Sequence, residues 1–594
     1  MIKLSDFVIK FISDLEVKHI FLLPGGGCMH LIDSVGKNKD IKHICFLHEQ
    51  AAVIAADGYA QYNNNIGVAI VTTGPGSTNA ITGVAASWID STPIIVISGQ
   101  VKRNDLQKKA GVRQMGIQEV DIISIVKPIT KYAETIIDPN SIKYHLQKAV
   151  FMTKEGRPGP VWLDIPIDVQ GSIINENNLP EFDIKDEIIS YNTQELSKKV
   201  AKCIDLLNNS ERPVMLAGNG IWLSGATQAF IDIIYKLKIP ILTTWRMLDL
   251  LPEDSEFFFG RPGSIASRYA NFIQQNADFI LVIGARLDLA QIGHNYNSFV
   301  PKGKKVIVDI DEREISKINT KIDIPIVSDA NYFIKEFKKQ FHNIKLKNIS
   351  EWLKKCKKWK IKYPLPKGTL TNDKKIDTYA FINILSFLLN ENDVIVPGSS
   401  GVGSEITLQT LKVKQGQRVI NSPGLGSMGF GLPQSIGVCL ASDSRRTICI
   451  VGDGGLQHNI QELETLKRLN IPIKLFVLNN NGYAAIRNTH KKFFDNRLVC
   501  CDPSSGLTLP NTCKIASAYG LKTKKINNSL HMKKDIENVL NTEGPIVCEI
   551  IIDPDLQITP KLSSIVKDDG SIVSAPLEDL YPFLDRNEFN DNII

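Results

Sequence analysis

Two short motifs constrain the fold of this chain most: a Gly-Asp-Gly turn at residues 452–454 and an Asn-Asn pair at 479–480. Each motif follows an apolar run, and a helical segment lies between them. The apolar run 447–451 is typical of a buried strand and leads into the turn, and residues 461–469 have the spacing of a helix. A second apolar run, 473–478, ends at the Asn pair. This strand–helix–strand pattern predicts a parallel α/β sheet in which the turn and the pair follow the carboxyl ends of two strands. Open α/β sheets bind ligands at that edge.

The residues at this predicted edge suit a divalent metal and a phosphate group. The Asp453 carboxylate and the Asn480 side-chain carbonyl are hard oxygen ligands for Mg²⁺, an ion that commonly keeps a diphosphate as co-ligand. Glycines on both sides of Asp453 let main-chain N–H groups approach phosphate oxygens. An isolated Gly-Asp-Gly would be an ordinary turn, but this spacing and context resemble the metal–diphosphate motif of thiamine diphosphate enzymes. The resemblance implies metal binding by Asp453, Asn480 and the main-chain carbonyl of Gly482, and cofactor binding by these residues together with Glu49, Gly403, Met428, Gly452, Gly454 and Tyr483.

A second signature lies near the amino terminus. Residues 46–52 close an apolar strand and open a helix of small residues. Glu49 stands at this junction, where a carboxylate is also simply a favourable charge for the first helical turn. Together with the glycine run 24–27 and the segment 72–79, however, the junction resembles the N-terminal domain of acetolactate synthase and its relatives. By that resemblance, Glu49 hydrogen-bonds the aminopyrimidine ring of the cofactor.

Bulk composition narrows the class of protein. A chain of 594 residues is too long for one hydrophobic core and indicates three or four domains. With 43% hydrophobic residues, 22% charged residues and a formal net charge of +6, it is typical of a globular protein and does not indicate nucleic-acid binding. We expect neither a membrane span nor a signal peptide. Ten scattered cysteines without Cys-x-x-Cys spacing indicate free thiols in a reducing compartment, so we expect a cytoplasmic protein.

Strand-like apolar runs alternate with helical segments along most of the chain, which predicts an α/β protein with doubly wound parallel sheets. A weak internal repeat, 159–166 against 544–551, indicates that the first and last domains share one architecture. Polar stretches at 175–196 and 345–373 are interpreted as linkers, and the residues after 560 show little periodicity. The predicted divisions, named by the resemblance, are a pyrimidine-binding domain at 1–190, a middle domain at 197–344, a diphosphate- and metal-binding domain at 374–553 and a C-terminal tail at 554–594.

The resemblance covers nearly the whole chain and implies three such doubly wound domains in this order. Relatives place each cofactor between the pyrimidine domain of one subunit and the diphosphate domain of another, so Glu49 is expected to work only in a homodimer or homotetramer. The middle domain binds FAD in acetolactate synthase. Parts of that pattern survive at 218–220, 284–286 and 309–311, but a Gly-Met-His-Gly segment of the synthases is Ser-Ile-Ala-Ser at 264–267. FAD therefore stays open beside an empty or ADP-occupied domain.

Three further residues acquire expected roles from the resemblance. Met428 stands where relatives place the apolar wedge that bends the cofactor, with an ordinary core side chain as the alternative. Gly26 and Gln118 match active-site positions that approach the substrate carbonyl, with a plain surface amide as the alternative for Gln118. We therefore expect Glu49, Gly26 and Gln118 to form the catalytic set.

The departures from acetolactate synthase concern the acceptor side of its reaction. The Arg that holds the carboxylate of the acceptor 2-keto acid in the synthases is matched by Ala290, and a methyl group cannot replace a bidentate guanidinium. A Trp and a Met of the acceptor pocket are matched by Thr489 and Ala485. Arg246 and Arg487 are new candidates for binding a phosphate or carboxylate on a large acceptor, with pairing to local carboxylates as the alternative. These changes predict a wider acceptor pocket that is less suited to a carboxylate.

The predicted function is that of a thiamine diphosphate- and Mg²⁺-dependent 2-keto acid decarboxylase/carboligase. We expect it to transfer the decarboxylated unit of a pyruvate-type donor to a carbonyl acceptor bulkier than pyruvate, such as a keto sugar. The alternatives are a true acetolactate synthase, a simple decarboxylase or C–C lyase, and a non-catalytic assembly relative. The last is disfavoured because Glu49, Asp453 and Asn480 are all present.

Overall fold

The computed structural model describes residues 1–107, 111–186, 192–370, 375–566, 569 and 572–594. By its internal contacts the chain divides into two compact units. The first unit comprises Met1–Ile189, Asn392–Ser404 and Ile420–Pro554, and the second comprises Ser190–Glu391, Glu405–Val419 and Asp555–Ile594. The first unit thus contains the predicted pyrimidine domain and most of the predicted diphosphate domain. The second contains the predicted middle domain and the C-terminal tail.

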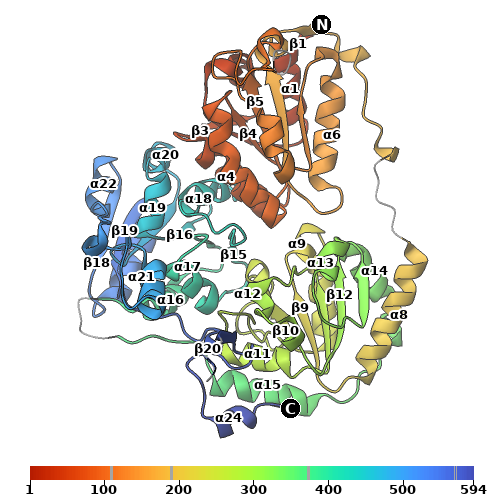
Figure 1. The fold of residues 1–594 in the computed structure, drawn as a ribbon, viewed down its shortest axis with the longest axis vertical. Helices are drawn as coiled ribbons and strands as arrows, with labels where there is room; N and C mark the ends of the chain where they lie inside the picture. The colour runs from red at the N-terminus through yellow and green to blue at the C-terminus, as the bar shows by residue number, and fades with distance from the viewer. Residues whose placement is uncertain (108–110, 187–191, 371–374, 567–568, 570–571) are drawn as a thin grey trace. The chain divides into compact units, whose positions relative to one another are not determined.

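The amino-terminal domain is built on one parallel sheet. Its strands follow one another in the order β3 (Lys42–Cys45), β2 (His19–Leu22), β4 (Gly67–Val71), β5 (Ile94–Gln100), β7 (Val161–Pro166) and β6 (Tyr132–Thr135). Its helices include α1 (Leu4–Ser13), α2 (Met29–Lys37), α3 (Glu49–Asn63), α4 (Pro75–Asp90), α5 (Ile122–Val126) and α6 (Ile142–Lys154), of which α1, α4 and α6 are labelled in Figure 1. A short antiparallel pair, β1 (Ile2–Lys3) with β8 (Ile173–Ile174), ties the start of the domain to its end.

The carboxyl-terminal domain repeats this topology. Its parallel strands β14 (Val394–Pro397), β16 (Thr447–Gly452), β17 (Ile473–Asn479), β19 (Ile546–Ile551) and β18 (Lys522–Ile526) lie in the same order as β2, β4, β5, β7 and β6. Because β7 and β19 occupy equivalent places, the topology supports the repeat predicted between 159–166 and 544–551. The helices that matter for the site are α18 (Gly431–Ala441), α19 (Asp453–Leu456), α20 (Glu462–Leu469) and α21 (Ala484–Phe493); α22 (Thr512–Ala518) and α23 (Met532–Asn541) complete the domain.

Helices α3 and α18 join the two domains of the first unit. A Cβ at Gly58 of α3 would lie 2.6 Å from the main-chain oxygen of Gln434, and a Cβ at Gly437 would overlap the main-chain oxygen of Ala55. Side chains larger than hydrogen would force these helices apart, because packed interiors leave no spare volume. The apolar cluster around this crossing takes in residues of both sheets, from Phe21 and Val71 to Val477 and Val547. The two domains therefore share one core.

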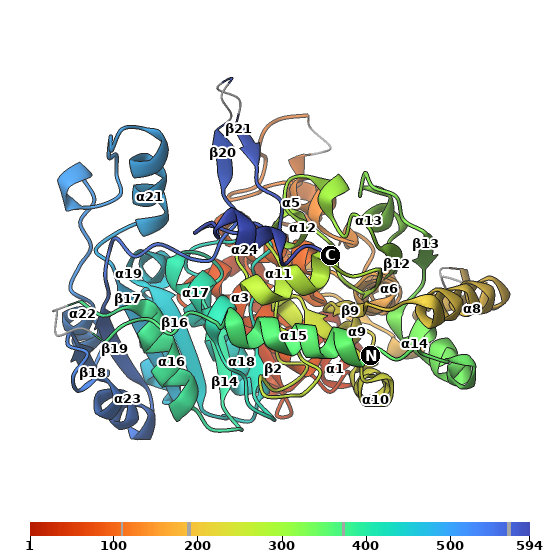
Figure 2. The same cartoon turned by 90° about the horizontal axis from the view of Figure 1, so that it is seen from below.

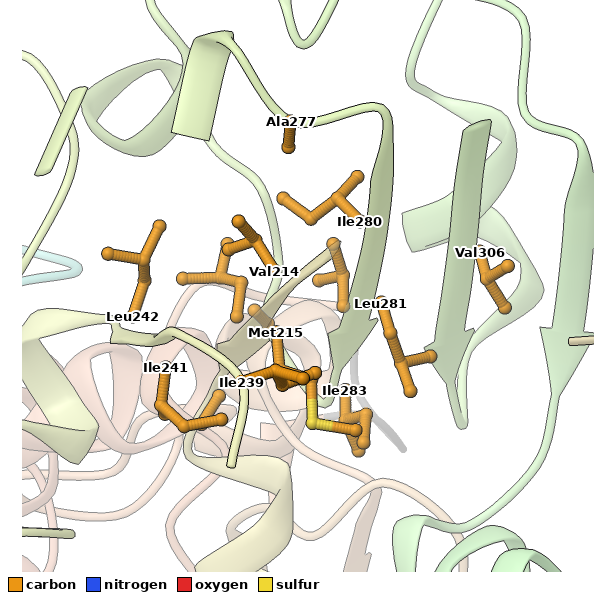
Figure 3. Packing of buried hydrophobic residues seen from close by; sticks show 14 of the residues in the cluster. Val214, Met215, Ile239, Ile241, Leu242, Ala277, Ile280, Leu281, Ile283 and Val306 are labelled. Carbon is orange, nitrogen blue, oxygen red and sulfur yellow. The ribbon is translucent and has the colours of Figure 1, made fainter. Parts of the chain in front are cut away.

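The middle domain is a third parallel sheet. Its strand order is β10 (Ile241–Thr243), β9 (Pro213–Ala217), β11 (Phe279–Ile283), β12 (Lys304–Asp309) and β13 (Ile324–Val327). Val214, Met215, Ile280 and Leu281 on the central strands pack against their neighbours in Figure 3, and β9 and β11 are buried along their whole length. Continuous apolar strands of this kind are typical of a parallel sheet covered on both faces. The helices of this domain are α8 (Thr193–Asn209), α9 (Gly220–Leu223), α10 (Thr227–Leu237), α11 (Arg268–Gln275), α12 (Leu289–Ile292), α13 (Glu312–Ser316) and α14 (Ala330–Lys339).

The stretch 345–373, predicted to be a linker, contains a helix, α15 (Ser350–Lys362). Its buried residues Trp352, Cys356 and Trp359 recur at helical spacing and pack into the core of the middle domain. The many lysines of this stretch lie between these positions and conceal the apolar stripe in the sequence. The structure therefore differs from the prediction of a plain linker.

The C-terminal tail is also more ordered than its sequence indicates. Asn271 of α11 donates a hydrogen bond to the main-chain oxygen of Leu577 at 2.6 Å, and Arg268 donates to that of Leu580 at 2.9 Å. An antiparallel hairpin, β20 (Ser564–Val566) with β21 (Ile572–Ser574), precedes these anchors, and a final helix, α24 (Arg586–Asn590), follows them (Figure 2). Elements this short leave little periodicity in a sequence, and side-chain bonds to the main chain hold them in place.

All ten cysteines are described, and none forms a disulfide, as predicted. Among the described residues, no helix combines the length and the apolar character needed to cross a bilayer.

Candidate active site

Asp453 begins α19 directly after β16. Asp453 is 2% exposed, and its carboxylate accepts hydrogen bonds from the main-chain N–H groups of Gly454 at 3.0 Å and Gly482 at 3.1 Å. Burial raises the pKa of this carboxyl to about 6, although the N–H donors act in the opposite direction. A cation beside Asp453 would offset the effect of burial, because an opposite charge favours the ionised form.

Asn480 directly follows β17, the neighbour of β16, so it reaches the same edge of the sheet as Asp453. It is buried, and its Oδ1 atom has no hydrogen-bond partner in the described structure. A buried carbonyl oxygen without a donor is costly, and coordination of a cation would satisfy it. The described residues include no cluster of three or more His, Cys, Asp and Glu side chains suited to a metal. The oxygens of Asp453, Asn480 and the adjoining main chain nevertheless fit Mg²⁺, which needs few protein ligands beside a diphosphate.

The Gly482–Tyr483 turn is shaped by close main-chain packing. Gly482 has φ of +134°, and a Cβ there would overlap the main-chain oxygen of Cys501, so this position requires glycine. Tyr483 donates its N–H to the same oxygen at 2.8 Å, and its ring lies where a Cβ at Gly454 would be. Gly452, in contrast, has open space around its missing side chain. Tyr483 therefore fills the space beside Gly454, whereas the space beside Gly452 is open.

Two other residues expected to bind the cofactor occupy different environments. Gly403 lies in α17 (Val402–Thr410) and is buried, and a Cβ there would lie 2.5 Å from the Leu478 side chain. Met428 is 36% exposed, so it is not an ordinary core side chain. An apolar side chain held at the surface beside the Gly429 turn is available to contact a ligand.

Glu49 is the first residue of α3 and is 7% exposed. His48 caps this helix, since its Nδ1 accepts the N–H of Gln50 at 3.1 Å. The Glu49 Oε2 atom accepts a hydrogen bond from Asn79 at 3.1 Å, and a Cβ at Gly76 would lie 3.3 Å from Oε1. Two segments singled out in the sequence thus meet at the Glu49 carboxylate.

Gly26 and Gln118 both lie at the surface of the amino-terminal domain. Gly26 is exposed with open space where a side chain would be, and Gln118 is exposed with φ of +64°. The main chain of Gln118 lies against Gly74, where a Cβ would overlap its carbonyl oxygen. The next residue, Glu119, is buried and accepts the main-chain N–H of Met115 at 2.8 Å, which holds this loop in its shape.

A cavity of about 170 Å³ lies beside the Gln118 loop. Its lining includes the carboxylates of Glu119, Asp121, Glu134 and Asp164. Asp164 is 1% exposed and accepts a hydrogen bond from Ser98 at 2.5 Å, and burial raises its pKa to about 7. This acidic lining does not favour an anionic diphosphate or keto acid.

The segment 459–462, which follows the Gly-Asp-Gly turn, contacts the Glu49 junction within the first unit. Glu462 of α20 is fully buried, and its Oε1 atom accepts the main-chain N–H of Leu47 at 3.1 Å. Asn459 donates hydrogen bonds to the Gln50 side chain at 3.2 Å and to the main-chain oxygen of Gly429 at 2.9 Å. This segment therefore holds the strand-to-helix junction and the Met428 turn together.

Sequence reasoning did not single out Glu462 or Asn459. A signal for Glu462 exists, because it shares helical spacing with Leu466 and Leu469 and so falls on the apolar face of its helix. A carboxylate on such a face is rarely buried without a partner. The partner itself, a main-chain N–H far away in sequence, is not visible in the pattern.

Helix α21 separates the expected substrate residues onto two faces. Ala485 and Thr489 are exposed one helical turn apart, and the Thr489 hydroxyl donates to the Ala485 carbonyl at 3.1 Å. Arg487 is 4% exposed, and its Nη2 atom donates to the main-chain oxygens of Asn480 at 3.1 Å and Pro554 at 2.9 Å. To bind a substrate anion, Arg487 would have to leave these partners.

The remaining two expected substrate residues lie in the second unit. Ala290 is exposed in α12, and its carbonyl accepts the N–H of Ser264 at 2.7 Å. Arg246 is half-buried in the single 3₁₀ turn Trp245–Met247. Because Ala290 is exposed, packing in a hydrophobic core does not explain the alanine at this position.

The turns that follow β9, β11 and β12 lie along the carboxyl edge of the middle sheet. Gly220 donates its N–H to the Gly284 carbonyl at 3.0 Å, and the Asp309 carboxylate accepts the N–H of Asp311 at 3.0 Å. This is the edge at which doubly wound sheets bind nucleotides. The glycines also serve the direct contact between the two turns, so their presence alone does not require a flavin.

Comparison with known proteins agrees with this geometry. Family models match three parts of the chain: the thiamine pyrophosphate enzyme N-terminal TPP-binding domain at residues 2–125, the central domain at 200–337 and the C-terminal TPP-binding domain at 401–550. The fold and these matches define an enzyme dependent on thiamine pyrophosphate, which is the same molecule as thiamine diphosphate. 

Curated relatives refine the class. The chain is 33% identical to the acetolactate synthase large subunit of Cyanidium caldarium, with 92% of each chain covered. It is 32% identical to that of Lactococcus lactis subsp. lactis, covering 99% of this chain and 98% of the relative, and 32% identical to a probable acetolactate synthase large subunit of Methanocaldococcus jannaschii, covering 93% and 92%. The chain belongs to the acetolactate synthase family of thiamine diphosphate-dependent carboligases and lyases.

Proposed function

We propose that this enzyme transfers the decarboxylated unit of a 2-keto acid of the pyruvate type to a carbonyl acceptor bulkier than pyruvate, such as a keto sugar. The observation that carries the proposal is the exposed face of α21, where Ala485 and Thr489 replace a Met and a Trp of the synthases. Ala290, in place of the Arg that holds the acceptor carboxylate, supports the same conclusion. A carboxylate entering a partly dry pocket needs a charged partner, and neither Ala290 nor Thr489 supplies one.

The metal and cofactor sites follow from the oxygens at the sheet edge. Asp453 and Asn480 would bind Mg²⁺ through their side chains and Gly482 through its carbonyl, while Gly452 and Gly454 would leave room for the diphosphate. Support comes from the buried Asn480 Oδ1 atom that lacks a hydrogen bond. Gly403 and Tyr483 would contact the same cofactor, and the exposed Met428 side chain would support its bent shape.

When bound, thiamine diphosphate supplies the carbon that takes up the donor carbonyl and holds the electron pair left by loss of CO₂. Glu49 would exchange a proton with the pyrimidine ring, since its Oε1 atom is not used by the Asn79 hydrogen bond. Gly26 and Gln118 would border the substrate carbonyl. In the overall reaction one C–C bond to the donor carboxylate breaks, one C–C bond to the acceptor forms, and the acceptor oxygen gains a proton.

The assembly and the middle domain belong to the same proposal. We propose a homodimer or homotetramer in which the pyrimidine domain of one subunit completes the diphosphate domain of another. The middle domain is a candidate FAD site, with an empty or ADP-occupied domain as the alternative. Acetolactate synthesis itself is the second candidate function, favoured by the names of the relatives.

The test is a product screen of the purified enzyme with thiamine diphosphate, Mg²⁺ and a panel of 2-keto acids, with and without keto sugars, read by mass spectrometry. The proposal predicts a new C–C-linked product that requires both substrates and is absent with Glu49→Gln. Aldehyde release equal to keto acid consumption, unchanged by any acceptor, would instead identify a simple decarboxylase.

A further inference from the structure

We propose that Arg487 is a positioning residue that fixes the proposed metal ligand Asn480 and ties α21 to the turn at residues 480–482, called here the metal turn. Helix α21 carries the acceptor face, which is formed by Ala485 and Thr489. This inference rests on the metal role proposed for Asn480. It changes the interpretation of Arg487, which the sequence presents as a candidate for binding the acceptor. The structure instead places its guanidinium inside the third domain, on main-chain oxygens.

The contacts of Arg487 define this role. Its Nη2 atom lies between the carbonyl oxygens of Asn480, at 3.1 Å, and Pro554, at 2.9 Å, and its Nη1 atom is 3.8 Å from the Asp502 carboxylate. The residue is 4% exposed. Its Nε atom is buried without a hydrogen-bond partner in the described structure, so the two carbonyl oxygens and the Asp502 carboxylate hold the guanidinium in place. Arg487 thereby connects the metal turn, the end of the domain and the loop at Asp502.

Other contacts also shape the turn at residues 480–482. Asn481 and Gly482, the residues after the proposed ligand, have φ of +61° and +134°, in the left-handed region that Asn and Gly adopt more readily than other residues. The Asn480 Oδ1 atom is buried without a hydrogen bond, so no hydrogen-bond donor fixes the direction of this oxygen. The bond from Arg487 to the main-chain carbonyl is therefore one contact that orients this residue, beside the Gly482 N–H that Asp453 accepts at 3.1 Å. Groups that orient a ligand in this way affect metal affinity without touching the metal.

Arg487 also links the metal turn to the acceptor face. Arg487 lies in the first turns of α21, and its N–H bonds the Tyr483 carbonyl at 3.0 Å, so the helix and the turn form one continuous element. Ala485 and Thr489 flank Arg487 in sequence and are exposed on the other side of the helix. A change at Arg487 is expected to move both the metal ligand and these two residues.

The test compares Mg²⁺-dependent binding of thiamine diphosphate, measured by calorimetry at several Mg²⁺ concentrations, in Arg487→Met, Arg487→Lys and a matched control. The control is Arg446→Met. Arg446 makes a comparable set of contacts in the same domain, with two bonds to Asp393 at 2.7 and 2.6 Å and one to the Leu540 carbonyl at 3.2 Å. It lies at the opposite, amino-terminal end of β16.

We expect Arg487→Met to raise the Mg²⁺ concentration for half-maximal cofactor binding roughly 10- to 100-fold, the range seen when groups behind a metal ligand are removed. Arg487→Lys should give a smaller shift, because an ammonium can still reach one carbonyl. Arg446→Met should lower the melting temperature without changing the Mg²⁺ requirement. An unchanged Mg²⁺ requirement in both Arg487 variants would overturn the inference, as would an equal shift in Arg446→Met.

A second measurement separates this inference from the proposed metal site. Asn480→Ala should raise the Mg²⁺ requirement by itself, and Arg487→Lys should then add little in the Asn480→Ala background, since both changes act through one ligand. If Asn480→Ala has no effect, the metal role of Asn480 is wrong and the inference fails with it. If Asn480→Ala has its effect but Arg487→Lys adds its full shift to it, the metal site stands and the positioning role of Arg487 is wrong.

Discussion

The Glu462 carboxylate accepts the main-chain N–H of Leu47 at 3.1 Å across a separation of 415 residues. Leu47 stands two positions before Glu49, so a side chain of the carboxyl-terminal domain fixes the junction at which the proposed proton-exchanging group begins its helix. Asn459 makes a parallel connection to Gln50, on the other side of Glu49. The position of the Glu49 carboxylate thus depends on both domains of the first unit.

We predict that Glu462→Ala lowers turnover by at least about 10-fold. The change removes the hydrogen bond between the Leu47 N–H and a charged carboxylate, worth about 1.5–3 kcal/mol, and loosens the Glu49 junction. Glu464→Ala is the control, because Glu464 stands on the same helix and contacts Lys467 at 4.0 Å. Steady-state kinetics and thermal melting of both variants provide the measurement. Equal turnover in the two variants would show that the Glu462 contact does not position Glu49.

For Glu49→Gln, we expect cofactor affinity close to that of the wild type and turnover lower by at least about 100-fold, the scale of a lost general acid–base group. The amide keeps the shape of the side chain but cannot exchange a proton. Deuterium exchange at the reactive carbon of bound thiamine diphosphate measures the step directly. Exchange as fast as in the wild type would contradict the role assigned to Glu49.

Asp453→Ala should weaken cofactor binding itself. Loss of a metal ligand is expected to lower affinity for thiamine diphosphate roughly 10-fold or more at low Mg²⁺ concentration, with partial recovery when Mg²⁺ is raised. Calorimetric titration at two Mg²⁺ concentrations tests this. Wild-type affinity at the lower concentration would exclude Asp453 as a ligand.

Asp164 gives a prediction about pH. Burial raises the pKa of Asp164 from its ordinary value of 3.8 to about 7, so between these pH values the folded protein binds more protons at this group than the unfolded chain does. The stability that protonated Asp164 contributes is therefore present below about pH 4 and is lost as pH rises to about 7, in total on the order of 4 kcal/mol. Melting temperatures of the wild type should fall over this interval more steeply than those of Asp164→Asn. Parallel curves would contradict the prediction.

The strands, and the sheet edge that carries Asp453 and Asn480, could be predicted because their signals are local. The apolar runs around 447–451 and 473–478 predict β16 and β17, and a parallel pair places Asp453 and Asn480 at one edge by necessity. The junction at Glu49 follows from the change of periodicity at one residue. Features of this kind require only short-range patterns in the sequence.

The contacts at Glu462 and Arg487 could not be predicted in the same way. Each partner is a main-chain group, which carries no side-chain identity in the sequence, and the Leu47 contact spans two domains. Arg487 is of a residue type that often binds anionic substrates, and only the structure shows that it is buried and that its Nη2 atom bonds two main-chain oxygens. Helix α15 was missed for a related reason, since the lysines between Trp352 and Trp359 outweigh the apolar stripe in composition.

The acceptor residues can be tested by reversing them. We predict that Ala290→Arg combined with Thr489→Trp raises acetolactate formation from pyruvate and lowers use of the natural acceptor. A buried guanidinium–carboxylate pair discriminates by about 2–5 kcal/mol, which is enough to change the preferred substrate. Thr489→Ser is the matched control on α21, because serine keeps the hydroxyl that bonds the Ala485 carbonyl and adds no bulk to the proposed pocket. Lower activity with both acceptors in the double variant, with no gain in acetolactate, would contradict the assignment.

The most direct test of the central claim is the rate at which the unmodified enzyme forms acetolactate from pyruvate alone, compared with the rate of its best C–C-bond-forming reaction on an added carbonyl acceptor. The account predicts that acetolactate formation is slow and that a bulkier acceptor, such as a keto sugar, supports a much faster reaction with the same donor. Acetolactate formation as fast as the best alternative reaction would contradict it and identify the enzyme as a true acetolactate synthase.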